Sequence, residues 1–321
     1  MAIRPAWFPD STLIAAMQAA MAESMRRRGG DELMSGTRRG GRGSESPGFA
    51  AYRLYTPGDD PRRLDWKLYA RSDHPYIRET EPETAVGEIF IVDRSASMRW
   101  HGDDNSGDSN RRTTKEDYAR TLTAAIAAGI LGIGDAVGAI SVGDDATWRE
   151  LPVSSERSVW ESLIDFLDAP LTSSGMLLEN PLCTRIGWLA DAPMRPRRIR
   201  ILSDFLELPD VLRSALTSLR ERHHRVTLLH IIDPAERDFP YTGTIRFRDP
   251  ESGRATLVAT DAARAMYLER FERFTEQLRR FCDERGIGYR RLITGSPSDV
   301  TLATLIDHDD FAFGSGFGGD S

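Results

Sequence analysis

The sequence predicts an α/β fold in which helices cover both faces of a mostly parallel sheet. Short, uninterrupted apolar runs, typical of strands buried on both faces, occur at Ile89–Val92, Val137–Val142, Ile199–Leu202 and Val226–Ile232. Helical patterns alternate with these runs, as they do in sheets built from parallel strands. Three of the runs end at an aspartate, where open α/β sheets usually place ligand sites.

The amino-terminal region predicts an amphipathic helix followed by a flexible connection. Asp10 and Ser11 are good helix starters, and apolar residues follow every fourth position at Leu13, Met17, Met21 and Met25. We expect this helix to close at Arg26–Arg28, before Gly29 and Gly30. The stretch 36–48, rich in Gly, Arg and Ser, then favours a flexible connection over a nucleic-acid-binding arm, since it contains no aromatic residue.

The segment from Tyr52 to Glu83 combines aromatic residues with many Arg and Asp side chains. Its motif is formed by Pro57, Gly58, Asp59, Asp60, Arg62, Asp65, Trp66 and Arg71. Pro-Gly favours a turn, and the opposite charges can pair within a loop-rich segment. We interpret the motif as a structural or interaction element that wraps against the main sheet, rather than as a catalytic one.

The remaining elements follow in alternation. Helices are predicted at 116–131, 159–167, 211–222 and 298–306, and a long helix carrying Tyr267, Phe271, Phe274, Leu278 and Phe281 is expected to end at Gly286. An antiparallel edge strand is predicted at 147–151, a hairpin at 244–247 and 255–259, and a last strand at 289–293. We therefore divide the chain into an amino-terminal region (1–84), an α/β domain (85–310) and a Gly- and Phe-rich disordered tail (311–321).

Oxygen-bearing side chains gather after the first buried run. Asp93, Ser95 and Ser97 follow it at alternate positions, and one carboxylate with two hydroxyls is a ligand set that suits Mg²⁺. The simpler alternative is a capped turn, since Asp and Ser bond the backbone readily after strands. Asp204 and Asp233 end two further strands, and carboxylates that converge on one sheet edge repel each other unless a cation lies among them.

These residues resemble two groups of proteins. Asp93-Arg94-Ser95-Ala96-Ser97-Met98 is similar to the Asp-x-Ser-x-Ser motif of the metal-ion-dependent adhesion site in von Willebrand factor A domains, and Leu202-Ser203-Asp204 is similar to the strand that completes that site. The stretch Tyr55–Trp66, with Asp233-Pro234 and Asp238-Phe239-Pro240, resembles the bacterial domain-of-unknown-function family 58. The resemblance covers roughly 43–306. It implies a Rossmann-like, von Willebrand factor A-like fold and an association with MoxR-type AAA+ ATPases.

One position departs from the adhesion-site pattern. That site normally takes a threonine from a loop between its two aspartates, and here Met176 stands at the corresponding position. A thioether is a poor ligand for Mg²⁺ or Mn²⁺. Thr172, Ser173 or Ser174 could substitute, or the site could bind metal weakly or not at all.

Composition limits the classes of function. Cys183 and Cys282 form no motif, which indicates reduced thiols in a cytoplasmic protein. The amino terminus does not resemble a signal peptide, and the apolar stretch 121–134 is shorter than the ~20 residues of a membrane-spanning helix. A net charge of -7 argues against general nucleic-acid binding.

Two functional hypotheses remain. The first is a non-enzymatic interaction module, in which the metal or its empty pocket receives an acidic residue of a partner protein. The resemblance implies that it works with a MoxR-type ATPase in the maturation or activation of other proteins. The second is a metal-dependent hydrolase that uses the strand-end aspartates. The sequence has no Gly-x-x-x-x-Gly-Lys phosphate loop, and its histidines form no pattern resembling a catalytic triad.

Overall fold

The computed structural model describes residues 4–34, 49–54, 76–80, 87–102, 113–144, 148–156, 158–171, 180–250 and 253–295. Within 25–34, 49–54 and 76–80 only the backbone is described. The chain divides into two compact units, a larger one formed by Met1–Arg28 with Gly87–Ser321 and a smaller one formed by Gly29–Val86.

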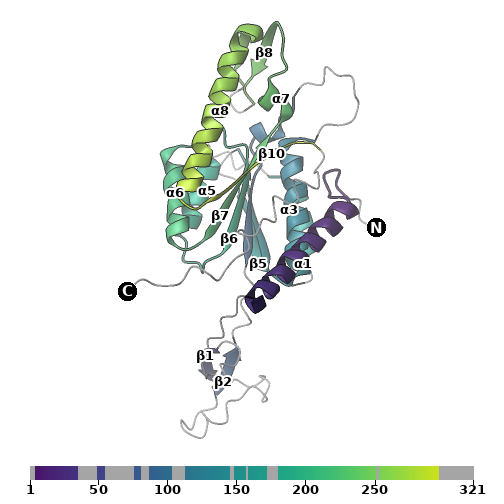
Figure 1. Ribbon diagram of the computed structural model, residues 1–321, viewed down its shortest axis with the longest axis vertical. Coiled ribbons are helices and arrows are strands. Elements are labelled where there is room, and N and C mark those ends of the chain that lie inside the picture. Colours follow the sequence, from purple (N-terminus) through teal and green to yellow (C-terminus); the bar gives the residue numbers. More distant parts are fainter. Residues whose placement is uncertain are drawn as a thin grey trace. The chain divides into compact units, whose positions relative to one another are not determined.

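A six-stranded sheet forms the centre of the larger unit (Figure 1). Its order is β10 (Gly288–Ile293), β7 (Arg225–Ile232), β6 (Arg198–Ser203), β3 (Glu88–Asp93), β4 (Val137–Val142) and β5 (Trp148–Ser154). All neighbouring pairs are parallel except β4 with β5, which confirms the predicted antiparallel edge strand. The chain proceeds from β3 to β4 on one side and later from β6 to β7 on the other. The strand order therefore reverses between β3 and β6, where open α/β sheets form a crevice.

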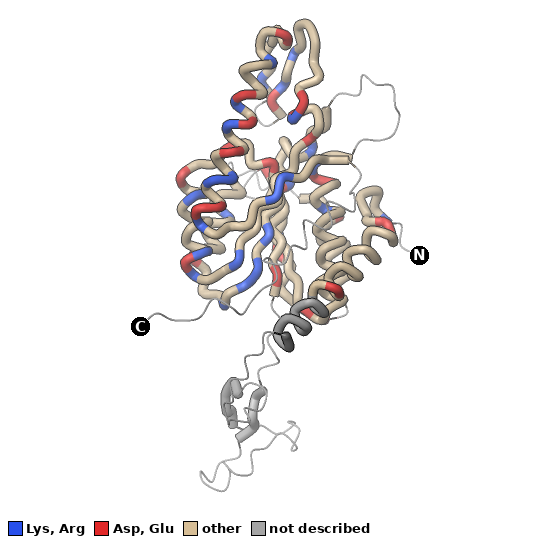
Figure 2. The backbone as a smooth tube through the Cα atoms, viewed as in Figure 1, with Lys and Arg blue, Asp and Glu red and all other residues tan. Residues whose placement is uncertain are grey.

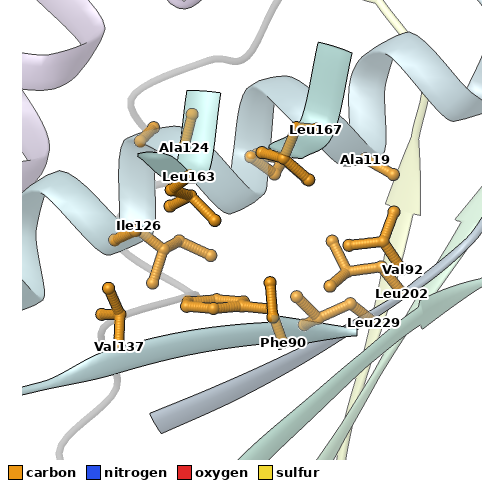
Figure 3. Close-up of a cluster of buried hydrophobic side chains, with 14 of the residues drawn as sticks. Phe90, Val92, Ala119, Ala124, Ile126, Val137, Leu163, Leu167, Leu202 and Leu229 are labelled. Carbon is orange, nitrogen blue, oxygen red and sulfur yellow. The ribbon is translucent and has the colours of Figure 1, made fainter. Parts of the chain in front are cut away.

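Helices cover both faces of this sheet. Alternate residues of β3 point to opposite faces, so that Phe90 and Val92 enter one core and Ile89 and Ile91 enter the other. The first core, shown in Figure 3, includes residues of α1 (Ser11–Met34), α3 (Lys115–Gly132) and α4 (Val159–Asp168). The second includes residues of α5 (Pro181–Asp191), α6 (Asp210–Glu221) and α8 (Thr260–Glu284). The prediction of a mixed α/β fold with a mostly parallel sheet is confirmed.

Helix α1 begins as predicted but ends later. Leu13, Met17 and Met21 are buried in the first core, as the four-residue spacing predicted. The helix nevertheless continues through Gly29 and Gly30 to Met34, so the predicted end at these glycines is wrong. Glycine costs only about 1 kcal/mol in a helix and keeps its backbone N–H donor, so it does not have to break one.

Several elements were missed by the sequence analysis. Helix α5 lies between β5 and β6, and the five-residue helix α7 (Pro234–Asp238) follows β7. A short 3-10 helix, η2 (Ser97–Arg99), follows the loop after β3. In the smaller unit, β1 (Phe49–Leu54) and β2 (Tyr76–Thr80) form an antiparallel pair within a segment that was expected to be loop-rich.

The hairpin predicted after α7 is confirmed as β8 (Thr244–Arg248) paired with β9 (Ala255–Ala259). Cys183 and Cys282 are both buried and form no disulfide. Other predictions lie outside the described residues. These are the connection at 36–48, the motif from Pro57 to Arg71, the loop with Thr172, Ser173, Ser174 and Met176, the helix at 298–306 and the tail.

Candidate functional site

Asp93 joins the end of β3 to the neighbouring strand β6. Its carboxylate is buried, with 6% of the residue exposed. Oδ1 accepts a hydrogen bond from the Ser95 backbone N–H at 3.0 Å, and Oδ2 accepts one from the Ser203 hydroxyl at 2.6 Å. The first bond is the local turn chemistry expected of an Asp after a strand. The second depends on β6 lying beside β3, so it fixes the carboxylate in the crevice between them.

The two serines of the motif lie side by side. The Ser95 and Ser97 hydroxyl oxygens are 3.0 Å apart, and Ser97 begins the short helix η2. The loop is held from the β4–β5 turn, because Asp144 accepts hydrogen bonds from the Ala96 N–H and from the Arg99 guanidinium. The alternate spacing of Asp93, Ser95 and Ser97 thus brings their three side chains to one place, as predicted.

The environment of Asp93 disfavours its charge. Burial and the negative charge of Asp204 together raise the pKa of Asp93 to about 6, although the hydrogen bonds from Ser203 and Ser95 oppose this shift. Asp204, at the end of β6, is therefore close enough for its charge to act on Asp93. The structure confirms that these two strand-end carboxylates converge.

A buried lysine supplies a cation at this edge. Lys115, the first residue of α3, is 1% exposed, and its Nζ lies 2.8 Å from Asp204 Oδ2 and 2.5 Å from Glu236 Oε1. Burial lowers the pKa of Lys115, but the two carboxylates outweigh this effect and hold that pKa above its ordinary value. The charge of Asp204 is therefore balanced from within the chain. Lys115 was not predicted as a site residue, although a lysine in the first turn of a helix opposes the helix dipole and could have indicated a special role.

The third strand-end aspartate has a different role. Asp233 caps α7: its Oδ1 accepts the Ala235 N–H at 2.8 Å, while Glu236 Oε2 accepts the Asp233 N–H at 2.8 Å. This reciprocal arrangement is a capping box. The carboxylate of Asp233 is therefore used by its own helix, and Asp233 was not among the predicted metal ligands.

Arg94 anchors the motif loop to the helix that follows it. This residue is buried, its Nε lies 2.6 Å from Glu116 Oε1, and its guanidinium donates to the Ala169 carbonyl at 2.8 Å. No role was predicted for Arg94 from the sequence. Its contacts fix the loop between Asp93 and Ser95 against α3 and the end of α4.

The motif opens into a cleft of about 770 Å³ at the carboxyl ends of β3 and β6. Asp93, Ser95, Ser97 and Asp204 line one part of it, and the first residues of α5 and the turn between β8 and β9 line others. Its lining includes five acidic residues, Asp93, Asp144, Asp204, Glu207 and Asp249, and one basic residue, Arg99. This excess of carboxylates favours a positively charged ligand over an anion.

The comparisons with known proteins agree with the sequence motifs. A family model described as "Protein of unknown function DUF58" matches residues 51–277, which is more than half of the chain. The chain belongs to the DUF58 family. Uncharacterized proteins of Mycobacterium tuberculosis and Mycobacterium bovis are each 30% identical to it over 227 residues, covering 70% of this chain and 66% of theirs. The chain thus spans just under two thirds of the length of these relatives.

Two solved structures are similar to this DUF58 chain at low identity. A conserved hypothetical protein, BatB from Bacteroides thetaiotaomicron, is 16% identical, with a TM-score of 0.40, over 69% of this chain and 97% of that one. An aerotolerance-related membrane protein from Bacteroides fragilis is 17% identical, with a TM-score of 0.42, over 70% and 98%. In the DUF58 chain itself, no helix among the described residues is long and apolar enough to cross a membrane.

The side chains of the cleft fit a hard divalent cation better than a soft one. Within the described ranges, no three His, Cys, Asp or Glu side chains are arranged to hold a metal ion. The oxygens of Asp93, Ser95 and Ser97 are nevertheless adjacent, and Mg²⁺ or Mn²⁺ commonly completes such a set with water.

Proposed function

We propose that this DUF58 protein is a non-enzymatic interaction module with a von Willebrand factor A-like fold, which receives an acidic side chain of a partner protein in the cleft. The observation that carries the proposal is the placement of Asp93, Ser95 and Ser97 in an acidic cleft where the strand order reverses. Open α/β sheets bind ligands at this position.

In this proposal Asp93, Ser95 and Ser97 hold Mg²⁺ or Mn²⁺, and Asp204 holds a coordinating water. Thr172, Ser173 or Ser174 is available for a further ligand position. Bound there, the cation supplies a positive charge that attracts the partner's carboxylate. Because the Lys115 ammonium offsets part of the charge of Asp204 and Glu236, these two carboxylates would not fully neutralise the cation. It would then keep much of its charge for the partner.

The proposed partners are a MoxR-type AAA+ ATPase and a client protein that the two mature or activate together in the cytoplasm. This proposal comes from the family resemblance. The oxygen ligands of the cleft are the groups through which such a partner would bind. The carboxylate of Asp93 accepts hydrogen bonds from Ser203 and Ser95, which would orient it toward the proposed cation.

Calorimetric titration of Mg²⁺ and Mn²⁺ tests the metal site. We expect heat of binding from the wild type and from a surface control, Glu269→Ala, whose side chain is 67% exposed. We expect none from Asp93→Ala. If the wild type gives no heat of binding, Met176→Thr tests whether the residue at this position prevents metal binding. A gain of binding in this variant would show that it does. Equal heats from the wild type and Asp93→Ala would contradict the metal site.

Binding of a purified MoxR-type ATPase from the same cell tests the interaction. Immobilised wild-type protein should retain the ATPase or its client, and retention should fall at least tenfold with EDTA or with Asp93→Ala, while Glu269→Ala behaves as the wild type. Circular dichroism checks that each variant is folded. Retention that is insensitive to both changes would place the interface elsewhere.

The hydrolase alternative is tested separately with phosphoester, peptide and ester substrates in the presence of Mg²⁺ or Mn²⁺. The interaction module should show no turnover. Sustained turnover that requires the metal and is abolished by Asp93→Ala would replace the proposal with a metal-dependent hydrolase.

A further inference from the structure

A second cavity, also about 770 Å³, lies beside the cleft and has a different character. Its floor is a cluster of four rings: Phe239, Tyr241, Phe247 and Tyr267. The Phe239 ring centroid is 4.5 Å from that of Tyr267, 5.2 Å from that of Tyr241 and 5.9 Å from that of Phe247. We call this cavity the aromatic groove. It is formed by α7, the β8–β9 hairpin and α8, three elements that lie together in Figure 1.

The aromatic groove combines apolar surface with basic residues. Met266 in its lining is 51% exposed and Leu206 is 62% exposed, so the groove presents apolar surface that a bound segment could cover. Arg246, Arg248 and Arg270 line it as well, and none of these three forms an ion pair within the described part of the chain. Such a groove suits a segment that carries both aromatic and acidic side chains.

Negative charge in the groove is largely compensated. Glu236 is the one acidic residue among the described lining residues, and Lys115 lies 2.5 Å from its carboxylate. The groove is therefore basic, in contrast to the acidic cleft next to it. The two cavities share Ser97, Leu206 and Pro250 in their linings, so they are adjacent at that boundary.

A segment of this chain outside the described residues has the complementary composition. Residues 307–313 read Asp-His-Asp-Asp-Phe-Ala-Phe, which places three carboxylates beside two phenylalanines. The described chain ends at Gly295, just after β10. There the Thr294 hydroxyl lies 3.4 Å from Asp233 Oδ2, and Asp233 caps α7, a wall of the groove. The intervening residues, 296–306, span about 20 Å if 298–306 is helical as the sequence predicts, and up to about 40 Å when extended.

We propose that the segment Asp307–Phe313 binds in the aromatic groove of its own chain. Phe311 and Phe313 would pack on the four rings, and Asp309 and Asp310 would pair with the arginines of the groove. This inference does not depend on a metal or on the proposed partner. It gives the protein a second binding site for acidic, aromatic peptide segments, next to the cleft, and a partner with such a segment would compete with the chain's own.

Competition by a labelled peptide tests the proposal in the full-length protein. The probe is a fluorescein-labelled synthetic peptide of residues 305–315, and its binding is followed by fluorescence anisotropy. The protein variant Phe311→Ala/Phe313→Ala should bind the peptide at least tenfold more tightly than the wild type, because its own segment no longer fills the groove. Equal affinity for the two proteins, or no binding to either, would overturn the proposal.

Charge reversal locates the peptide. In the Phe311→Ala/Phe313→Ala background, Arg270→Glu should lower the affinity for the peptide at least tenfold. Arg273→Glu is the control: it lies three residues along α8, beside Glu269, and should leave the affinity unchanged. A peptide carrying Asp309→Lys and Asp310→Lys should regain affinity for the Arg270→Glu protein, which separates a lost contact from a lost fold. Failure of this rescue would place the peptide outside the groove.

Sedimentation velocity distinguishes binding within one chain from exchange between two copies. The wild type should remain monomeric over a hundredfold range of concentration. A dimer that dissociates in the Phe311→Ala/Phe313→Ala variant would overturn binding in the same chain, because the occupant would then belong to a second copy.

Discussion

At the scale of single residues, two buried groups titrate in opposite senses. Burial and the charge of Asp204 raise the pKa of Asp93 to about 6. Burial lowers the pKa of His230, whose Nδ1 lies 2.8 Å from the Tyr289 hydroxyl, to about 4. The folded protein thus holds a proton on Asp93 more firmly than the unfolded chain does, and holds one on His230 less firmly. Their effects on stability between pH 4 and 6 therefore oppose each other.

Asp93→Asn should stabilise the protein at neutral pH. A carboxyl with a raised pKa reduces the free energy of unfolding as the pH rises from about 4 to 6, because the unfolded chain loses its proton first. Removing the charge should raise the free energy of unfolding at pH 7 by on the order of 1 to 3 kcal/mol, with little change near pH 4. Urea unfolding in EDTA at both pH values measures this.

Asp93→Asn should also lose stability more steeply than the wild type in acid. The neutral, buried His230 contributes to the free energy of unfolding, and this contribution is lost as the pH falls from about 6.5 to 4. In the wild type the titration of Asp93 opposes this loss, and in the variant it does not. Glu269→Gln serves as a surface control. A variant less stable than the wild type at pH 7 would show that the carboxylate's hydrogen bonds outweigh its burial.

Lys115→Met should destabilise the protein strongly. Its ammonium lies between Asp204 and Glu236, and removing one partner of a buried ion pair costs about 3 to 5 kcal/mol. Adding Glu236→Gln should restore part of the loss, since one of the two carboxylates is then neutral. Thermal and urea unfolding measure both variants. Arg280→Met, whose side chain is 70% exposed, is the control, and a loss as small as that control's would contradict a buried ion pair.

At the scale of elements, the packing of α1 on α3 depends on one glycine. A Cβ at Gly129 would lie 2.8 Å from Met21 Cγ and 3.0 Å from Met17 Cγ, closer than side chains normally approach. Gly132, one turn later, would place its Cβ 3.6 Å from Gln18, at an ordinary contact distance. The close approach of the two helices is therefore needed at Gly129 and not at Gly132.

Substitutions at these two glycines should have contrasting effects. Gly129→Leu should lower the free energy of unfolding by about 1 to 3 kcal/mol, because the added side chain forces α1 and α3 apart. Gly132→Ala should leave it unchanged or raise it by up to about 1 kcal/mol, through better helix propensity. Thermal unfolding of both variants is the measurement. Similar melting temperatures for the two would show that α1 does not pack closely on α3.

At the scale of the whole molecule, charges of both signs lie close together along α8, whereas the cleft gathers acidic residues and the aromatic groove gathers basic ones. Lys and Arg alternate with Asp and Glu along α8, where Arg279 pairs with Glu276 and Asp283 (Figure 2). The sequence carries a net charge of -7, and the cleft is acidic. A protein with this net negative charge attracts the phosphate backbone of nucleic acids only weakly.

General nucleic-acid binding should therefore be absent. Fluorescence anisotropy with a labelled DNA duplex and a labelled single-stranded RNA should show no binding at 150 mM salt with micromolar protein. The amino-terminal Arg-Gly segment is the part that could act alone, so deletion of 36–48 is the informative comparison. Binding that falls steeply with salt and is lost on this deletion would contradict the prediction.

The sequence by itself determined the features that depend on neighbours along the chain. The strands of the sheet were predicted because continuous apolar runs are short and bounded, as in β3 and β7. The meeting of Asp93, Ser95 and Ser97 follows from their alternate spacing in one loop. The family was recognisable from motifs of the same local kind. Helix α5 was not predicted. The five-residue helix α7 was not predicted either, because it is too short to show a helical periodicity.

Only the tertiary structure decided what surrounds that loop. Lys115 is 89 residues from Asp204 and 121 residues from Glu236 in the sequence, and nothing in local spacing predicts that the three meet. They meet because β3, β6 and β7 are adjacent parallel strands whose ends, and the helices beside them, share one edge. The same sheet order brings Ser203 to Asp93, whereas Asp233 turns to its own helix. Contacts of this kind depend on strand order and helix placement, which the pattern of single segments does not contain.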